Sequence, residues 1–158
     1  MMNIKNLLVS SFFILASTTA CSAESTEVKS TKKEQTGTLT VHVTNIRDAK
    51  GQLMVAIHDT KRAYDDNNER AAYAAITMKL KSKAAGFSFH DLPQGNYAVV
   101  LFHDENANGV FDIRGDEPLE GYGMSGARHA LDQPSFRKAS VPVGNETRTV
   151  SVKMHYYK

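Results

Sequence analysis

The alternation of apolar and polar residues that begins after Gly37 is the feature that most constrains the fold of this chain. Leu39, Val41 and Val43 alternate with threonine and histidine, and residues 53–57 again carry an apolar residue at every second position. A period of two places alternate side chains on opposite sides of a strand, so that one side is buried. Residues 48–51 have turn chemistry, and we expect them to join the two strands as a hairpin.

Further short strands are expected along the rest of the chain. They cover residues 76–81, 86–90, 97–103, 140–143 and 147–155, and Gly144-Asn145 predicts a second hairpin between the last two. The run 97–103 is apolar on both sides, which predicts a central strand. The polar segment 61–75 favours a loop with at most one helical turn. Because no long segment has helical periodicity, the sequence predicts an all-β fold, an antiparallel β-sandwich of about seven strands with an immunoglobulin-like architecture.

The first 36 residues divide into two segments. Residues 1–23 combine Lys5 with a short apolar run that ends in small residues, which predicts a signal peptide. Cys21 lies at the expected cleavage point and resembles the acylated cysteine of bacterial lipoproteins; ordinary cleavage nearby is the alternative. Residues 22–36 are polar with one large aliphatic residue, so we expect a disordered tether. The β-sandwich domain is then expected over residues 37–158.

These segments predict an exported protein that is periplasmic and held to the outer membrane by a lipid on Cys21, with no other membrane contact. Nineteen Lys and Arg against seventeen Asp and Glu give a net charge of +2 without blocks of one sign. Nucleic-acid binding is not expected, because it normally requires a basic patch. The single cysteine excludes an internal disulfide.

Residues 104–112 have the spacing of a loop that wraps a calcium ion. Side-chain oxygens stand at positions 1, 3, 5 and 9, with a glycine at position 6. The departures from an EF-hand are Gly115 at position 12 and the lack of flanking helices. The alternative is a loop that its own hydrogen bonds hold without metal. The expected ligands are Asp104, Asn106, Asn108, the Val110 carbonyl, Asp112 and Asp116.

Two neighbouring segments supply the other candidate site residues. His103 is in phase with the apolar positions of its strand and directly precedes the calcium-type loop, so we expect it to brace that loop. Within the glycine-rich stretch 120–126, Tyr122, Gly123 and Ser125 are the residues expected to line a ligand groove. The alternative for this stretch is an irregular connection between strands.

Four motifs of the chain resemble the bacterial DUF2141 family. They are Leu92-Pro93-x-Gly95-x-Tyr97, His103-Asp104-Glu105-Asn106-x-Asn108-Gly109-x-x-Asp112, Glu120-x-Tyr122-Gly123-x-Ser125 and Pro134-Ser135-Phe136-x-x-Ala139. The resemblance implies an exported protein with a sandwich similar to transthyretin-like and Cna-B-like domains, and it implies no reaction. It also implies that the loop at 104–112 and the motif at 122–125 are the family's recognisable elements. The insert 114–116 departs from the family pattern and leaves the end of any ion site open.

Together these features predict a non-enzymatic envelope module. It is an exported β-sandwich, stabilised by calcium, that binds an envelope protein or glycan through its loop face. One alternative is a metal-assisted hydrolase in which His103 and Asp104 act with a catalytic water. Another is a metal-free structural spacer.

Overall fold

The computed structural model describes residues 35–66 and 69–157. The predicted signal peptide, Cys21 and most of the predicted tether therefore lie outside the described residues. Thr36, the last residue of that tether, already belongs to the first strand. The elements are β1 (Thr36–Thr44), β2 (Gln52–His58), α1 (Lys61–Asp65), the 3₁₀ helix η1 (Glu69–Ala71), β3 (Ala74–Lys79), β4 (Ala85–Pro93), β5 (Gly95–Asp104), β6 (Ile113–Arg114), β7 (Glu117–Pro118), β8 (Gly121–Met124), α2 (Phe136–Ala139), β9 (Val141–Val143) and β10 (Thr147–Lys153).

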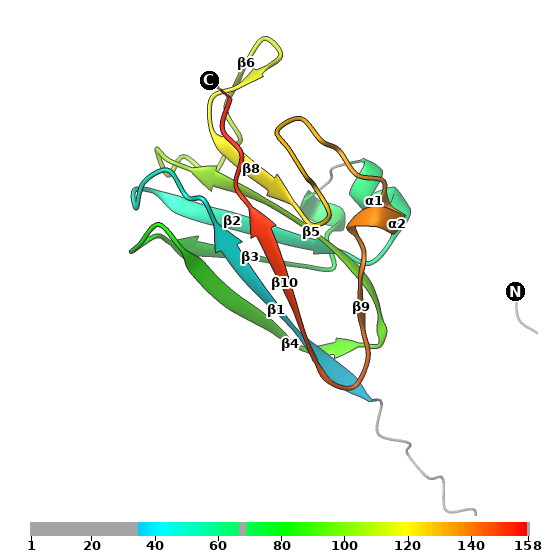
Figure 1. Cartoon of the computed structure of the whole chain (residues 1–158). Coiled ribbons are helices and arrows are strands. Elements are labelled where there is room, and N and C mark those ends of the chain that lie inside the picture. Colours follow the sequence, from blue (N-terminus) through cyan, green and yellow to red (C-terminus); the bar gives the residue numbers. More distant parts are fainter. Residues whose placement is uncertain (1–34, 67–68, 158) are drawn as a thin grey trace, which may run out of the picture. The chain divides into compact units, whose positions relative to one another are not determined.

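The strands form two main sheets that pack face to face (Figure 1). The first sheet has the order β10-β1-β4, and the second has the order β3-β2-β5-β8, with β9 paired to the start of β5. β6 and β7 form a small separate hairpin. The predicted all-β sandwich is confirmed, with ten strands in place of about seven. The pairing of β1 with β10 is parallel, whereas the other strand pairs among the described residues are antiparallel.

Neither predicted hairpin forms. β1 and β2 follow each other in sequence but belong to different sheets, and β9 pairs with β5 while β10 pairs with β1. Gly51 allows the crossing from β1 to β2, because it has a φ of +64° and a Cβ there would lie 2.0 Å from the Asp104 carbonyl oxygen. The turn residues thus mark changes of direction correctly, but each turn leads into the opposite sheet.

The core lies between the two sheets, and β5 runs through its centre. β5 pairs with β2 along one edge and with β8 and β9 along the other, which confirms the prediction of a central strand. Apolar side chains at every second position of β1, β2 and β5 meet in this core. They include Leu39, Val41, Val43, Leu53, Val55, Ile57, Val99 and Leu101.

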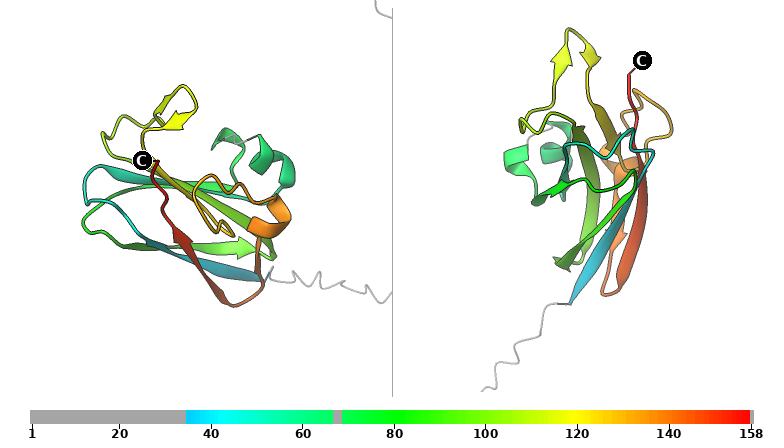
Figure 2. Two further views of the ribbon diagram at one scale, coloured as in Figure 1. Left: turned by 45° about the horizontal axis from the view of Figure 1, so that its top comes forward. Right: turned by 90° about the vertical axis from the view of Figure 1, so that its left-hand side faces the viewer.

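Two short helices cover one end of the second sheet on its outer side (Figure 2). Residues 61–75 contain α1 and η1 as well as loop, and Thr60 begins α1 because its Oγ1 accepts a hydrogen bond from the Ala63 amide at 3.3 Å. Tyr64 of α1 packs with Ala98 of β5 and Ala139 of α2 in a small second cluster. No helix among residues 35–66 and 69–157 is long and apolar enough to span a membrane.

Candidate functional site

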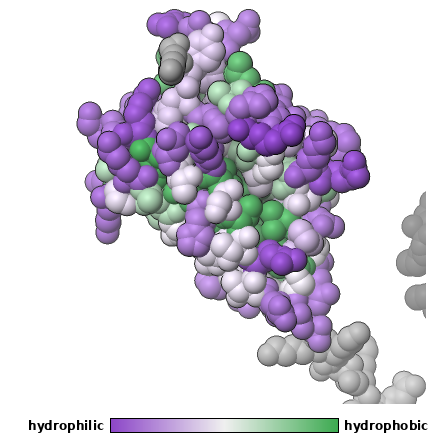
Figure 3. Space-filling model, viewed as in Figure 1, coloured by the Kyte–Doolittle hydropathy of each residue, from purple (hydrophilic) through white to green (hydrophobic). Residues whose placement is uncertain are grey.

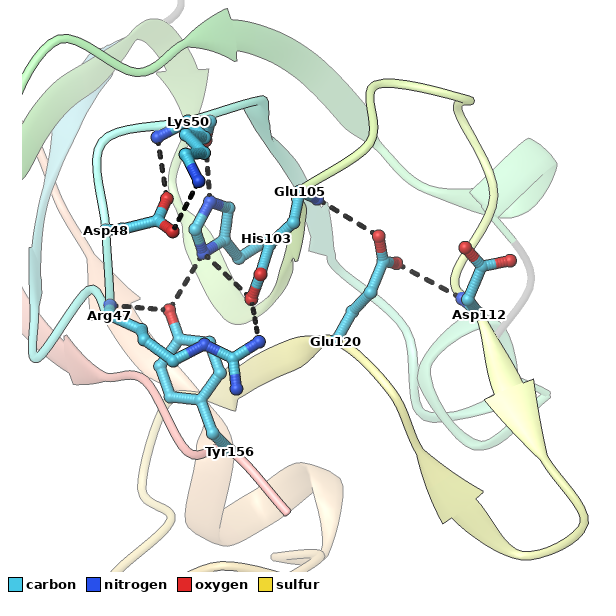
Figure 4. A network of polar contacts seen from close by, with 8 residues as sticks. All are labelled: Arg47, Asp48, Lys50, His103, Glu105, Asp112, Glu120 and Tyr156. Atoms are coloured by element: carbon cyan, nitrogen blue, oxygen red, sulfur yellow. Dashed lines mark hydrogen bonds and ion pairs between the residues drawn. The ribbon is translucent and has the colours of Figure 1, made fainter. Parts of the chain in front are cut away.

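His103 joins three parts of the chain at the base of the segment 104–112, which we call the Asx loop (Figure 4). The imidazole is fully buried, with Nε2 2.8 Å from the Lys50 carbonyl oxygen and Nδ1 2.9 Å from the Tyr156 hydroxyl. A carbonyl oxygen only accepts, so Nε2 carries the hydrogen and donates it. The Tyr156 hydroxyl in turn accepts from the Arg47 amide at 3.0 Å. His103 therefore ties the end of β5 to the β1–β2 connection and to the C-terminal segment.

Asp104 closes the Asx loop from its first position. Its side chain is fully buried and accepts hydrogen bonds from the Gly109 amide at 2.7 Å, the Asn108 amide at 3.1 Å and Gln52 Nε2 at 2.8 Å. Burial alone would raise the pKa of Asp104, but the hydrogen bonds from Gln52 and the loop amides outweigh it and lower the pKa. The carboxylate is thus an internal brace whose charge the loop itself stabilises.

The two asparagines of the Asx loop bond within the loop as well. Asn106 Oδ1 accepts from the Asn108 amide at 2.9 Å, and Asn108 Oδ1 accepts from the Val110 amide at 2.8 Å. Their Nδ2 atoms donate to Asp112 Oδ2 at 2.7 and 3.1 Å. These contacts correspond to the predicted alternative in which hydrogen bonds hold the loop without metal.

Glu120 holds the same loop from outside, and the sequence prediction missed this role. The residue is 4% exposed. Its Oε1 accepts from the Glu105 amide at 3.0 Å and its Oε2 from the Asp112 amide at 3.1 Å (Figure 4). Burial raises the pKa of Glu120, against the effect of these two hydrogen bonds. One carboxylate therefore fixes both ends of the Asx loop.

The expected calcium ligands are only partly brought together. Asp104, Asn106, Asn108 and Asp112 converge on one loop, and their carboxylate and amide oxygens suit a hard cation. Calcium would have to replace hydrogen bonds that Asp104, Asn106 and Asn108 now accept. Asp116 lies in the turn between β6 and β7, and no hydrogen bond or ion pair in the described part of the chain joins it to the Asx loop. Within residues 35–66 and 69–157, no group of three or more His, Cys, Asp and Glu side chains is arranged to hold a metal.

The motif at 122–125 contributes one accessible side chain and two structural residues. The Ser125 hydroxyl is buried, accepts from the Val99 amide at 2.8 Å and donates to the Ala139 carbonyl at 2.7 Å. Gly123 lets β8 approach the C-terminal strand, since a Cβ there would lie 2.9 Å from the Lys153 carbonyl oxygen. Tyr122 is half-buried, and its hydroxyl accepts from the Leu131 amide at 2.7 Å.

A pocket of about 510 Å³ lies on the outer side of the second sheet, and Tyr122 contributes to it. The strand register explains its floor, because residues aligned across neighbouring strands share one side of the sheet. Two rows of such residues cross the sheet. They are Thr77, Met54, Phe102 and Tyr122 in one row and Ala75, Ala56, Val100 and Met124 in the other. Because alanine side chains are short, the second row rises less above the sheet where it crosses β3 and β2 than where it crosses β5 and β8.

Aromatic rings form one wall of this sheet-face pocket. Phe111 of the Asx loop lies between Phe102 and Tyr122, with ring centroids 5.4 and 6.1 Å away. The β6–β7 hairpin continues this side, and Leu131 stands on the segment that follows β8. Ile113 of that hairpin is 54% exposed and Leu131 is 61% exposed, with a φ of +65° that is unusual for leucine. The Asx loop thus positions Phe111, and with it the wall of the pocket.

His58 is the least exposed polar side chain of the pocket lining. It stands in the next row along the sheet, opposite Ala98, and is 1% exposed. Its Nδ1 is buried and has no hydrogen-bond partner in the part of the chain that the structure describes. Burial lowers the pKa of His58, against the charge of Asp59, so the neutral imidazole is favoured. An unsatisfied buried polar atom costs about 1–3 kcal/mol.

The sequence contains a signal for this pocket in the residues that lie between the buried positions of β2. In β1 the residues between the buried ones are polar, whereas in β2 they are Met54 and Ala56. A strand that is apolar on both sides needs a cover on each. Here the second side forms the pocket floor.

One family comparison covers the Asx loop and the sheet-face pocket. The family model described as an uncharacterized protein conserved in bacteria (DUF2141) matches residues 41–151. The chain belongs to this family. The matched range of this DUF2141 chain contains the Asx loop, Glu120 and the residues of the sheet-face pocket. The searches of curated proteins and of solved structures gave no match.

Proposed function

We propose that this DUF2141 protein is a non-enzymatic envelope module that binds its partner in the sheet-face pocket. The observation that carries the proposal is the apolar hollow of about 510 Å³ on the outer side of a sheet. The outer side of an antiparallel sheet is usually polar where it faces water. Ligand sites are typically apolar hollows of about 300–1,000 Å³ with a few polar groups.

The chemistry of the lining favours an apolar partner. Of the two partner classes expected from the sequence, a protein side chain suits a floor of Met54, Ala56 and Val100 better than a glycan does. A glycan would leave hydroxyl groups without partners on such a surface. The proposed binding face is therefore the sheet side with its loop walls, which includes Tyr122 of the predicted groove.

The non-enzymatic part of the proposal rests on the state of the candidate catalytic groups. His103 and Asp104 are both fully buried, and both ring nitrogens of His103 are hydrogen-bonded. A metal-assisted hydrolase would need these groups to face a substrate and a water. No contact of His103 or Asp104 favours that alternative.

The envelope location rests on the leader sequence. Export by the signal peptide at 1–23, acylation at Cys21 and a tether up to residue 36 would hold the domain at the periplasmic side of the outer membrane. Mass spectrometry of the mature N-terminus tests this part: a lipid on Cys21 supports it, and an unprocessed Met1 would contradict it.

Calcium is part of the proposal as a stabiliser of the Asx loop and hence of Phe111. At about 100 times its dissociation constant, an ion adds roughly 2.7 kcal/mol to the free energy of unfolding. We expect millimolar calcium to raise the melting temperature relative to chelator, more than magnesium does, and Asp112→Ala to abolish the rise. An unchanged melting temperature would show that hydrogen bonds alone hold the loop.

Binding in the pocket is tested with N-phenyl-1-naphthylamine, an uncharged dye that fluoresces in apolar surroundings. Ala56 lies in the middle of the floor and is 8% exposed, so Ala56→Leu places extra side-chain volume inside the hollow. We expect the full-length protein to bind the dye and Ala56→Leu to weaken binding at least about tenfold, a change of about 1.4 kcal/mol. Ala49→Leu in the exposed β1–β2 connection is the matched control. Absence of dye binding, or equal binding by Ala56→Leu, would contradict the proposed function.

A further inference from the structure

We infer that the sheet-face pocket takes an uncharged amphiphile, with its apolar body on the sheet floor and a hydrogen-bonding head group at His58. This inference rests on the proposed function and specifies the chemistry of the group that the partner places in the pocket. It derives from three features of the pocket: the position of His58, the unused nitrogen of its imidazole, and the distribution of the other polar groups.

The position of His58 makes it the polar end of the floor. The Met54 and Ala56 rows are apolar, and His58 follows them on the same side of β2. Tyr64 of α1 stands against the imidazole, with ring centroids 6.1 Å apart and planes at 77°. A ligand that lies along β2 therefore meets apolar side chains first and the imidazole where α1 closes the sheet side.

The imidazole supplies a buried hydrogen-bonding position that no described residue satisfies. Nδ1 of His58 is buried without a partner among the described residues, whereas His103 uses both of its nitrogens. Tyr64 does not satisfy His58, because its hydroxyl donates to the Pro134 carbonyl at 2.8 Å. Because that atom is inaccessible to solvent in this conformation, a ligand hydroxyl or carbonyl group would provide the missing bond once the imidazole or the Tyr64 ring against it turns.

The charge of the head group follows from the surroundings of His58. The group carrying a formal charge in the lining is Asp116, which is exposed in the turn between β6 and β7. The neutral form of His58 is favoured and the described lining holds no Lys or Arg, so a carboxylate or phosphate head would be buried without a counter-charge from that lining. An uncharged head avoids this cost.

The pocket offers the apolar body of the amphiphile two kinds of side chain: flexible methionines and aromatic rings. Met54 and Met124 flank the low part of the floor, and their flexible thioethers fill irregular space. The Phe102, Phe111 and Tyr122 rings form the adjoining wall. Both an aliphatic and an aromatic body fit these surfaces, so the head group is the feature that the test addresses.

The test compares two ligands of the same length that differ in the head group. 1-Octanol donates and accepts hydrogen bonds, whereas 1-chlorooctane offers only a weak acceptor. Each displaces N-phenyl-1-naphthylamine from the full-length protein, and the ratio of their inhibition constants isolates the head group. We expect His58→Leu to reduce the preference for octanol about fivefold, the size of one net hydrogen bond. Thr40→Val is the matched control, because it removes a hydroxyl from the outer side of the first sheet, outside the pocket lining, and should leave the ratio unchanged.

A second measurement uses the unsubstituted protein and so does not depend on the folding of a variant. We expect octanol to shift the ¹⁵N resonances of the His58 imidazole and chlorooctane to leave them in place. An equal ratio in wild type and His58→Leu, an equal loss in Thr40→Val, or unmoved His58 resonances at octanol saturation would overturn the inference while dye binding persisted. Failure of the dye to bind the wild-type protein would instead overturn the proposed function itself.

Discussion

The two sheets of the sandwich differ on their outer sides although their inner sides are alike. β1 and β2 each direct leucine, valine or isoleucine into the core. On the outer side β1 carries Thr38, Thr40 and His42, while β2 carries Met54, Ala56 and His58. Figure 3 shows the molecule from the side on which β10 and β1 lie nearest the viewer, and most of that surface is hydrophilic. The difference supports the proposed binding role of the outer side of the second sheet.

The difference extends to what covers each side. The outer side of the first sheet pairs small polar groups, such as the Thr40 and Ser88 hydroxyls at 2.9 Å. The outer side of the second sheet is bordered by the Asx loop, the β6–β7 hairpin and two short helices. Buried carboxylates hold that cover in place, and buried charges are costly unless they are paired or hydrogen-bonded. Buried, hydrogen-bonded carboxylates that hold loops beside an apolar hollow are typical of a binding site.

Removal of the Glu120 carboxylate is expected to damage the pocket side most. Glu120→Ala leaves the Glu105 and Asp112 amides without their acceptor. Because each unsatisfied buried donor costs about 1–3 kcal/mol, we expect a loss of about 3 kcal/mol in the free energy of unfolding. Urea denaturation measures this loss, and dye titration should show weaker binding because Phe111 is no longer fixed.

Glu117→Ala is the matched control for Glu120. Glu117 lies on the β6–β7 hairpin and pairs with Arg114 at 3.4 Å, but both side chains are substantially exposed. Exposed ion pairs contribute about 0.2–1 kcal/mol. Equal losses for the two variants would show that Glu120 does not hold the Asx loop.

The sequence predicts the inner side of this fold better than the outer side. The alternation of apolar and polar residues that starts at Leu39 and again at Leu53 predicts these strands correctly. Burying one side of a strand requires an apolar residue at every second position, and this pattern is local in the sequence. The partners of those strands are not local: Gly51 sends the chain into the other sheet, which no residue pattern near it specifies. The pocket rows join residues from four strands, and Glu120 bonds amides 15 and 8 positions earlier. Such contacts follow from register and topology, so spacing along the chain predicts the Asx loop but neither the pocket nor the role of Glu120.

Phe111 of the pocket wall and Phe87 of β4, which packs against the core between the sheets, offer a direct comparison. Both are half-buried phenylalanines that contact another phenylalanine ring, Phe111 beside Phe102 at 5.4 Å and Phe87 beside Phe89 at 5.8 Å. We expect both alanine variants to lose stability, since each removes an aromatic contact worth about 0.5–1.5 kcal/mol beyond its buried area. Only Phe111→Ala should also weaken dye binding, by about tenfold. Equal dye affinities for the two variants would place the binding site elsewhere.

Acidification should act on the pocket side through His58. Burial lowers its pKa below the ordinary value of 6.5, so the unfolded chain binds a proton that the folded protein rejects. The stability from neutral His58 is fully present above about pH 6.5 and is lost as the pH falls toward the folded pKa, with a slope of at most about 1.4 kcal/mol per pH unit. We expect urea midpoints to fall between pH 7.5 and 5.5, and to fall less in His58→Leu. Burial also lowers the pKa of His155, which keeps part of the slope in that variant. An unchanged slope in His58→Leu would contradict the assignment.

The smallest effect is expected on the polar side of the sandwich. Thr40→Val removes the hydroxyl that bonds Ser88 across β1 and β4, while valine keeps the branched shape that suits a strand. Cross-strand pairs of this kind contribute about 0.2–1 kcal/mol, so the unfolding midpoint should move little. Dye affinity should stay unchanged, because β1 contributes no residue to the pocket lining. A loss of dye binding in Thr40→Val would mean that the core transmits changes from the outer side of the first sheet to the pocket. The two sheets would then act as one coupled structure, and the distinction between a binding side and a supporting side would be wrong.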